Sequence, residues 1–243
     1  AARCQLMARP REISGSPGSR IRVLLGQAGD DYLYFLDEDT GDREFQTLNW
    51  TTGSGGLPSG LASQLNNLPA KGRHVTQVSF GPDGEWFVHG VKRDGSGGYS
   101  WWGGTSAADS IKEWSGSSHT LQVAFGHDCR WALIQGGNGS WFSYGINKHL
   151  EERVGRVRKR RKTVHFLRLF PDDGYIISDS LEGLQWGLSH APLEEELKKR
   201  SGGGTIRDVA LAGDRQWIVI RDERFAASTG VSTELTTRLA QFY

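Results

Sequence analysis

A dense run of positive charge is the feature of this sequence best suited to binding chemistry. The run RVGRVRKRRK at 153–162 holds seven basic residues in ten. These residues are Arg153, Arg156, Arg158, Lys159, Arg160, Arg161 and Lys162. Such a segment suits contact with nucleic acid phosphates, with an acidic protein partner or with a nuclear-import receptor. The alternative is a solvated helix end, because the run follows a predicted helix and cations stabilise helix C-termini.

Two observations favour a protein partner over nucleic acid for this run. No aromatic residue lies within it, so stacking of bases on this segment is not expected. The whole chain has 29 Lys and Arg against 28 Asp and Glu, a net charge of +1, which gives no global field to steer nucleic acid. We therefore expect no sequence-specific nucleic acid recognition.

Three tryptophans, Trp101, Trp141 and Trp186, lie near the ends of predicted strands, beside glycine or polar residues. An exposed tryptophan in such a place can stack on a sugar ring or on a side chain of a partner. Neighbouring residues of a strand point to opposite faces, so Trp101 and Trp102 cannot both be buried against the same neighbour. The three are candidate ligand-stacking residues, and the alternative is that they wedge between repeats and helices.

Four aspartates recur at one position of an internal repeat. They are Asp83, Asp128, Asp172 and Asp214. A ring of carboxylates could bind a cation or a basic peptide, but Asp beside Gly also builds hairpin turns, and we favour the turn. The two cysteines, Cys4 and Cys129, form no CxxC pair, and no HExxH motif occurs. We therefore expect no metal site and no cofactor.

Patterns typical of enzymes are few in this chain. The seven histidines are scattered, and no GxSxG elbow, Walker loop or GxGxxG after a strand occurs. Loop acids such as Asp94 and Glu182 could serve a propeller glycosidase, but nothing selects them from the other loop acids. The sequence therefore predicts a protein that is not an enzyme, with a glycoside hydrolase as a minor alternative.

The elements that must position these residues come from an internal repeat. Five segments start near residues 21, 75, 120, 164 and 206, each with an apolar residue three positions later and an aromatic residue eleven positions later. The aromatic residues are Tyr32, Trp86, Trp131, Tyr175 and Trp217. Alternating apolar and polar residues around Gly-Pro-Asp-Gly or Asp-Asp-Gly predict strand, tight turn, strand.

Each unit continues into a third strand and then a helix. The third strand ends in an aromatic residue and glycine, as in SWWGG at 100–104 and LQWG at 184–187. The next stretch has apolar residues three or four apart, as in Leu61, Leu65 and Leu68, which predicts a helix with one apolar face. A three-stranded sheet with one helix cannot bury both faces alone, so the units must stack, and radial stacking leaves only short edges.

The pattern FGPDGEWFV at Phe80–Val88, followed by Trp101, resembles the repeats of β-propeller proteins of the WD-like and tachylectin-like kinds. The resemblance covers roughly residues 21–243 and concerns the fold only. It implies a mainly β chain, a five-bladed β-propeller whose repeats have three antiparallel strands plus a short helix. The helix leaves a five-fold α/β propeller as the alternative, although hydrolases of that family need a late nucleophilic cysteine that is missing here.

The sequence predicts an N-terminal leader over residues 1–20 and a single propeller domain over 21–243. No apolar run approaches the roughly 18 residues of a membrane span, so none is expected. Two cysteines in 243 residues are typical of an intracellular protein, with the cytoplasm as the first location. The basic, acid-poor leader resembles the end of a transit peptide, which leaves an organelle as the second location.

Function must be argued from sites rather than from fold, and the blades share a core pattern but differ in loops and charge. We therefore expect a non-enzymatic scaffold or interaction module that binds a protein partner through its loops and the basic segment 153–162. The alternative is a glycan-binding lectin with pockets between blades, for which Trp101, Trp141 and Trp186 supply the aromatic surfaces.

Overall fold

The computed structural model describes residues 21–25, 32–38, 45–50, 57–92, 94–115, 121–136, 140–170, 173–199, 204–212 and 216–243. The predicted leader over residues 1–20 lies outside these ranges. The chain divides into two compact units, residues 1–57 with 190–243 and residues 58–189, and each is described by itself.

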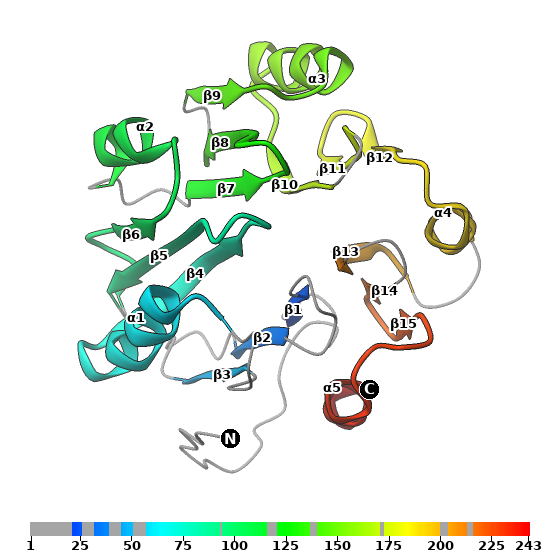
Figure 1. The fold of residues 1–243 in the computed structure, drawn as a ribbon, viewed down its shortest axis with the longest axis horizontal. Helices are drawn as coiled ribbons and strands as arrows, with labels where there is room; N and C mark the ends of the chain where they lie inside the picture. The colour runs from blue at the N-terminus through cyan, green and yellow to red at the C-terminus, as the bar shows by residue number, and fades with distance from the viewer. Residues whose placement is uncertain are drawn as a thin grey trace. The chain divides into compact units, whose positions relative to one another are not determined.

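The unit of residues 58–189 holds three antiparallel sheets of three strands, each with its strands in chain order (Figure 1). This unit begins with helix α1 (Ser59–Ala70), and its first complete repeat is β4 (Arg73–Phe80), β5 (Trp86–Lys92), β6 (Tyr99–Gly103) and α2 (Ala108–Trp114). The second is β7 (Leu121–Phe125), β8 (Trp131–Gln135), β9 (Trp141–Tyr144) and α3 (Lys148–Lys159). The third is β10 (Val164–Leu169), β11 (Tyr175–Asp179) and β12 (Gly183–Gly187). The first strands lie side by side, because β7 contacts both β4 and β10.

The other unit holds two such sheets. One is β1 (Ile21–Leu25), β2 (Tyr32–Glu38) and β3 (Phe45–Trp50). The other is β13 (Ile206–Ala212), β14 (Gln216–Arg221) and β15 (Phe225–Ala227), preceded by α4 (Ala191–Lys198) and followed by α5 (Thr233–Leu239) and a 3-10 turn, Ala240–Phe242. Strand β1 of the first repeat lies against β13 of the last repeat.

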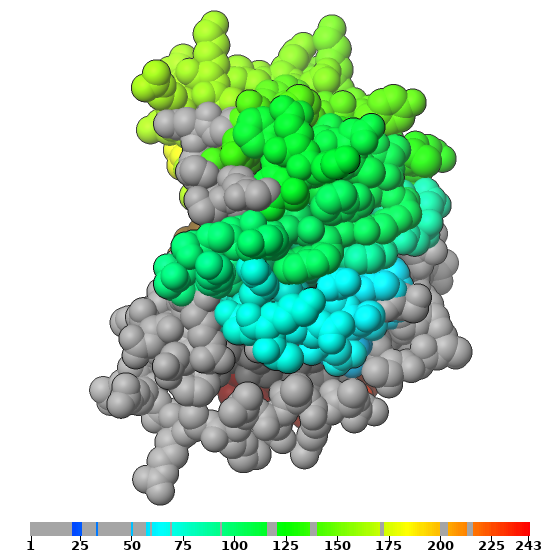
Figure 2. Space-filling view, turned by 90° about the vertical axis from the view of Figure 1, so that its left-hand side faces the viewer, coloured from blue at the N-terminus to red at the C-terminus, as the bar shows by residue number. Residues whose placement is uncertain are grey.

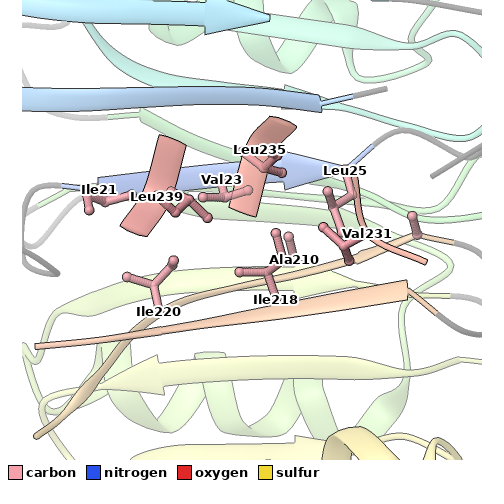
Figure 3. Close-up of a cluster of buried hydrophobic side chains, with 10 residues drawn as sticks. Ile21, Val23, Leu25, Ala210, Ile218, Ile220, Val231, Leu235 and Leu239 are labelled. Atoms are coloured by element: carbon pink, nitrogen blue, oxygen red, sulfur yellow. The ribbon is translucent and has the colours of Figure 1, made fainter. Parts of the chain in front are cut away.

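Figure 3 shows the core that joins these first and last repeats. Alternate residues of β1, Ile21, Val23 and Leu25, point toward Ala210 of β13 and the α5 residue Leu235. A polar contact adds to this apolar one, since the backbone N–H of Val23 donates to the buried Asp208 carboxylate at 3.0 Å. The same relation occurs between the two sheets of residues 121–187. There the side chain of Gln122 donates to the Val164 carbonyl at 3.1 Å.

The repeat read from the sequence is confirmed at the level of its elements. Each repeat has three antiparallel strands in chain order and then a helix, and the chain is mainly β with antiparallel three-stranded sheets. The apolar residue three positions after each start is buried in all five repeats. These residues are Leu24, Val78, Val123, Leu167 and Val209. The predicted apolar faces of the helices are likewise buried, as in Leu61, Leu65 and Leu68 of α1.

The repeated aspartates lie in turns where the structure describes them. Asp83 and Asp128 are exposed in the hairpins β4–β5 and β7–β8, while Asp172 and Asp214 lie outside the described residues. In the second hairpin Asp128 and Cys129 have φ of 59° and 58°, the left-handed pair that a two-residue type I′ turn requires. The backbone of Gly126 donates across this turn to the Arg130 carbonyl at 2.8 Å. The turn interpretation therefore fits both described members.

Steric crowding explains why the third strand ends in glycine in two of the sheets. Gly103 lies opposite Trp86 across the β5–β6 ladder, and a Cβ on Gly103 would stand 2.4 Å from the Trp86 indole nitrogen. Gly187 lies opposite Tyr175 in the same way, with 2.7 Å to the nearest ring atom. In these two sheets the aromatic residue that begins the second strand therefore lies over a glycine of the third, whereas Trp131 of β8 lies opposite Tyr144 of β9.

Candidate partner-binding site

Helix α3 carries most of the basic run. The Asn147 side chain caps its start by accepting from the backbone N–H of His149 at 2.9 Å. Leu150, Val154 and Val157 form its fully buried face. The helix continues through Lys159, so the prediction that the run follows the helix is wrong. The first four cations of the run are on α3 itself, and the last three lie past its end.

Arg153 does not belong to an exposed surface. It is 1% exposed, and its Nε and Nη2 donate to Asp179 Oδ2 at 2.9 Å and 2.6 Å. Its Nη1 donates to Glu182 Oε2 at 3.0 Å, and its Nη2 also reaches the Gly183 carbonyl at 3.0 Å. The predicted role of Arg153 in partner binding is therefore wrong: its guanidinium joins α3 to the end of β11 inside the protein.

The acids around Arg153 are themselves held in place. The second oxygen of Asp179, Oδ1, accepts the backbone N–H groups of Leu181 and Glu182, each at 2.8 Å. The hydrogen bond from Arg153 holds the pKa of Glu182 below its usual range. Arg156 lies 3.5 Å from the same Glu182 carboxylate and is largely exposed. Arg156 is thus both part of this network and available at the surface.

The C-terminal end of α3 has a defined geometry. The backbone N–H of Lys162 donates to the Val157 carbonyl at 3.0 Å, and that of Arg161 donates to the Arg158 carbonyl at 2.9 Å. These two bonds make a Schellman motif, in which the residue after the C-cap is left-handed and is usually glycine. Here that residue is Arg161, with φ of 55°. An arginine thus occupies a position where a Cβ is strained.

The remaining cations gather at this turn. Lys159, Arg160, Arg161 and Lys162 are exposed, and none has a carboxylate partner among the residues that the structure describes. Arg158 is half-buried, and burial lowers the pKa of its guanidinium. Figure 2 shows the segment around α3, in yellow-green, at the upper edge of the visible face with side chains projecting into solvent. We call residues 156–162 the basic turn.

The ligand-stacking candidates occupy different surroundings. Trp101 lies beside Tyr99 on β6, with ring centroids 6.3 Å apart, and the Arg73 guanidinium lies 3.8 Å from the Tyr99 ring centroid. Tyr99 is 46% exposed. Trp102 points the other way and packs on the core of Phe87, as the alternation of a strand requires. This cation–aromatic stack is a surface feature of β6.

The other two candidates are both partly exposed. Trp141 of β9 packs against the core that includes Leu150 and Val154. Trp186 of β12 is half-buried and lies opposite Ile176 in the β11–β12 ladder. The three tryptophans belong to three different sheets.

Sequence reasoning missed Arg73 and Tyr99 as parts of a possible site. The available signal was the spacing of Tyr99 and Trp101, two aromatic residues on one face of a strand. Arg73 gave no such signal, because it comes from a strand 26 residues earlier and reaches Tyr99 only through the fold. Its Nη1 also donates to the Gly97 carbonyl at 3.1 Å, which fixes its position.

Other chemistry is sparse in the described part of the chain. No group of three or more His, Cys, Asp or Glu there is placed to hold a metal ion. Cys129 is exposed in its turn, and Cys4 lies outside the described ranges. Of the helices that the structure describes, none combines the length and the apolar character needed to cross a membrane. No protein-family model matches the chain, and no curated protein matches its sequence.

Proposed function

We propose that this protein is a non-enzymatic interaction module that binds an acidic protein partner through the basic turn. The observation that carries the proposal is the row of four exposed cations, Lys159 to Lys162, with no carboxylate partner in the described residues. An acidic segment placed against them would supply the missing counter-charges and form charge-assisted hydrogen bonds.

Stabilisation of the helix alone does not account for this row. Cations help a helix C-terminus within its last turn, where the partial negative charge lies. Arg161 and Lys162 lie past the end of α3, and Arg161 occupies a left-handed position that glycine would fill without strain. Four adjacent like charges also repel one another. A role in binding would explain why the chain carries these cations, whereas stability of the helix does not.

The scaffold that we propose is a closed five-bladed propeller. In its support, β1 packs on β13, so the first repeat meets the last. The residue two positions after the repeat start also bonds to the backbone of the first strand of a neighbouring sheet in each of the two compact units. Gln122 bonds to the backbone of β10, and Asp208 bonds to the backbone of β1. The five-fold α/β propeller is the alternative scaffold. An intracellular location, in the cytoplasm first and an organelle second, belongs to the same proposal.

The experiment compares two triple variants with matched charge. The test variant is Lys159→Ala, Arg160→Ala and Lys162→Ala, which keeps the left-handed Arg161. The control variant is Lys71→Ala, Lys112→Ala and Lys148→Ala, three exposed lysines elsewhere in the same unit. We expect the wild type and the control to elute from a size-exclusion column as a complex with acidic proteins of a source extract, and the test variant to elute alone. Elution of all three chains alone, or of all three in the same complex, would overturn the proposal.

A glycan-binding lectin is the second candidate, because one observation favours it. Tyr99 and Trp101 present neighbouring rings on β6, and Arg73 lies over the Tyr99 ring. A sugar ring stacks on such a surface through its C–H groups, and a guanidinium beside it can donate to hydroxyls. A glycan array with the wild type and with Trp101→Ala tests this candidate. Binding that is lost in the variant supports a lectin, and an array without any binder removes it.

A further inference from the structure

Thr163 lies at the junction between the basic turn and strand β10. It is exposed, and its backbone is fixed on both sides by Ser180. The Thr163 N–H donates to Ser180 Oγ at 3.0 Å, and the Thr163 carbonyl accepts from the Ser180 N–H at 2.9 Å. The hydroxyl-bearing side chain is therefore presented to solvent at a defined place, directly after four cations.

The residues before Thr163 would fit an enzyme with an acidic substrate groove. Arg160 and Arg161 stand three and two positions before it, and Lys162 stands one position before it. Arginine binds carboxylates through two parallel N–H bonds, so two adjacent arginines at a fixed distance from a hydroxyl can position that hydroxyl for transfer. Both arginines are exposed and have no carboxylate partner among the described residues.

We propose that Thr163 is a phosphorylation site for an arginine-directed serine/threonine kinase, and that its phosphorylation closes the basic turn to the partner. In the transfer, Thr163 Oγ1 forms a bond to the γ-phosphorus of ATP, and the bond from that phosphorus to the β,γ-bridging oxygen breaks. ADP leaves, and the hydroxyl proton passes to the carboxylate base of the kinase. The second half of the proposal, the closing of the basic turn, rests on the proposed function.

The effect on binding follows from charge. A phosphothreonine carries about −1.5 to −2 charges at neutral pH and three acceptor oxygens. Placed beside Lys162 and Arg161, it would form ion pairs within the chain and compete with an acidic partner for the same donors. It would also repel the carboxylates of that partner.

The chain contains a matched control for this site. Thr205 occupies the equivalent place in the next repeat, one residue before strand β13, and it is also exposed. Its N–H donates to the Asp222 carboxylate at 2.8 Å, and its carbonyl accepts from the Asp222 N–H at 3.1 Å. The residues before it are Gly202, Gly203 and Gly204 rather than cations. Thr205 thus shares the local backbone contacts of Thr163 and lacks the preceding cations.

The modification is tested on the full chain with ATP, Mg²⁺ and the catalytic subunit of cyclic-AMP-dependent protein kinase as the arginine-directed probe. Tandem mass spectrometry should find phosphate on Thr163 and none on Thr205. The variant Arg160→Gln with Arg161→Gly should lose the modification, and so should Thr163→Val. Absence of phosphate on Thr163 in the wild type, or equal labelling of Thr205, would overturn the assignment.

The regulatory half has its own readout, the binding of poly-L-glutamate as a surrogate for an acidic partner. Phosphorylated chain should bind it about tenfold more weakly than unmodified chain. Equal binding by the two forms would overturn the regulation while leaving the modification site in place. If the unmodified chain does not bind poly-L-glutamate although Thr163 is phosphorylated, the proposed function fails and the modification site stands.

Discussion

Arg153 of α3 and Glu196 of α4 occupy the same position in their helices, three residues after the first buried leucine, and carry opposite charges. Each pairs with the residue that ends the second strand of the following sheet. Arg153 pairs with Asp179, while Glu196 lies 3.7 Å from Arg221. All four side chains are buried. The helix therefore carries the positive charge of the ion pair in one repeat and the negative charge in the next.

Loss of the Arg153 charge should destabilise the protein strongly. Arg153→Met would leave Asp179 ionised and buried without its cation, and breaking a buried pair in this way costs about 3–5 kcal/mol. Arg156→Met is the control, because that side chain is 53% exposed and its ion pair should contribute about 0–1 kcal/mol. Urea unfolding followed by circular dichroism measures both, and equal losses would contradict the account of Arg153.

Two glycine-to-alanine substitutions should change the stability of the protein in opposite directions. Gly103→Ala would place a Cβ 2.4 Å from the Trp86 indole nitrogen, so the ring must move, at a cost of about 1–3 kcal/mol. Gly155→Ala on α3 meets no atom within 4 Å and should stabilise the protein by about 0.5–1 kcal/mol, because glycine is a poor helix residue. Thermal unfolding of the two variants decides the matter, and a stabilised Gly103→Ala variant would refute the packing argument.

The stability should depend on pH through His89. This residue is fully buried, its Nδ1 shares a hydrogen bond of 2.8 Å with Ser100 Oγ, and burial lowers its pKa from 6.5 to about 4. The unfolded chain therefore binds a proton between about pH 6.5 and 4 that the folded chain excludes. Stability from this group is present above pH 6.5 and falls as the pH drops toward 4, by about 3 kcal/mol in total.

The variant His89→Gln isolates this contribution from those of the carboxylates. Its free energy of unfolding should lie furthest below that of the wild type at pH 7. The difference should shrink as the pH is lowered toward 4, because only the wild type loses the His89 contribution. A difference that stays constant over this range would show that His89 does not titrate as its burial requires.

The end of α3 offers a test that separates strain from charge. Arg161→Gly removes the Cβ from a left-handed residue and should stabilise the protein by about 0.5–1 kcal/mol. Lys162→Gln, which removes one charge next to it without relieving strain, should change the stability by less. Differential scanning calorimetry compares the two. Destabilisation by Arg161→Gly would mean that the Arg161 side chain makes a stabilising contact.

The repeated elements could be predicted because their signals are local. Leu150, Val154 and Val157 lie four and three residues apart, and this spacing alone places them on one helical face. Trp86 and Gly103 could be recognised from the sequence as members of the repeated pattern. That the Trp86 ring lies over Gly103 becomes visible only in the register of β5 and β6. The strand and helix positions thus follow from residues that are close in the chain.

The contacts of the basic run could not be predicted from local spacing. The Asp179 partner of Arg153 stands 26 residues later, in another repeat, and the sequence gives no direct sign of the pair. An indirect sign existed, since Arg153 follows Leu150 by three residues and therefore lies on the buried face of its helix. The left-handed Arg161 was also hidden, because the usual glycine is missing from the helix end.

The reversed ion pairs have a consequence for how the chain can change in evolution. Removal of residues 164–205, one whole repeat, would place α3 directly before β13 and β14. Arg153 would then meet Arg221 instead of Asp179, and two buried cations would face each other where a pair of opposite charges now lies. The charges of these two ion pairs would therefore disfavour this deletion.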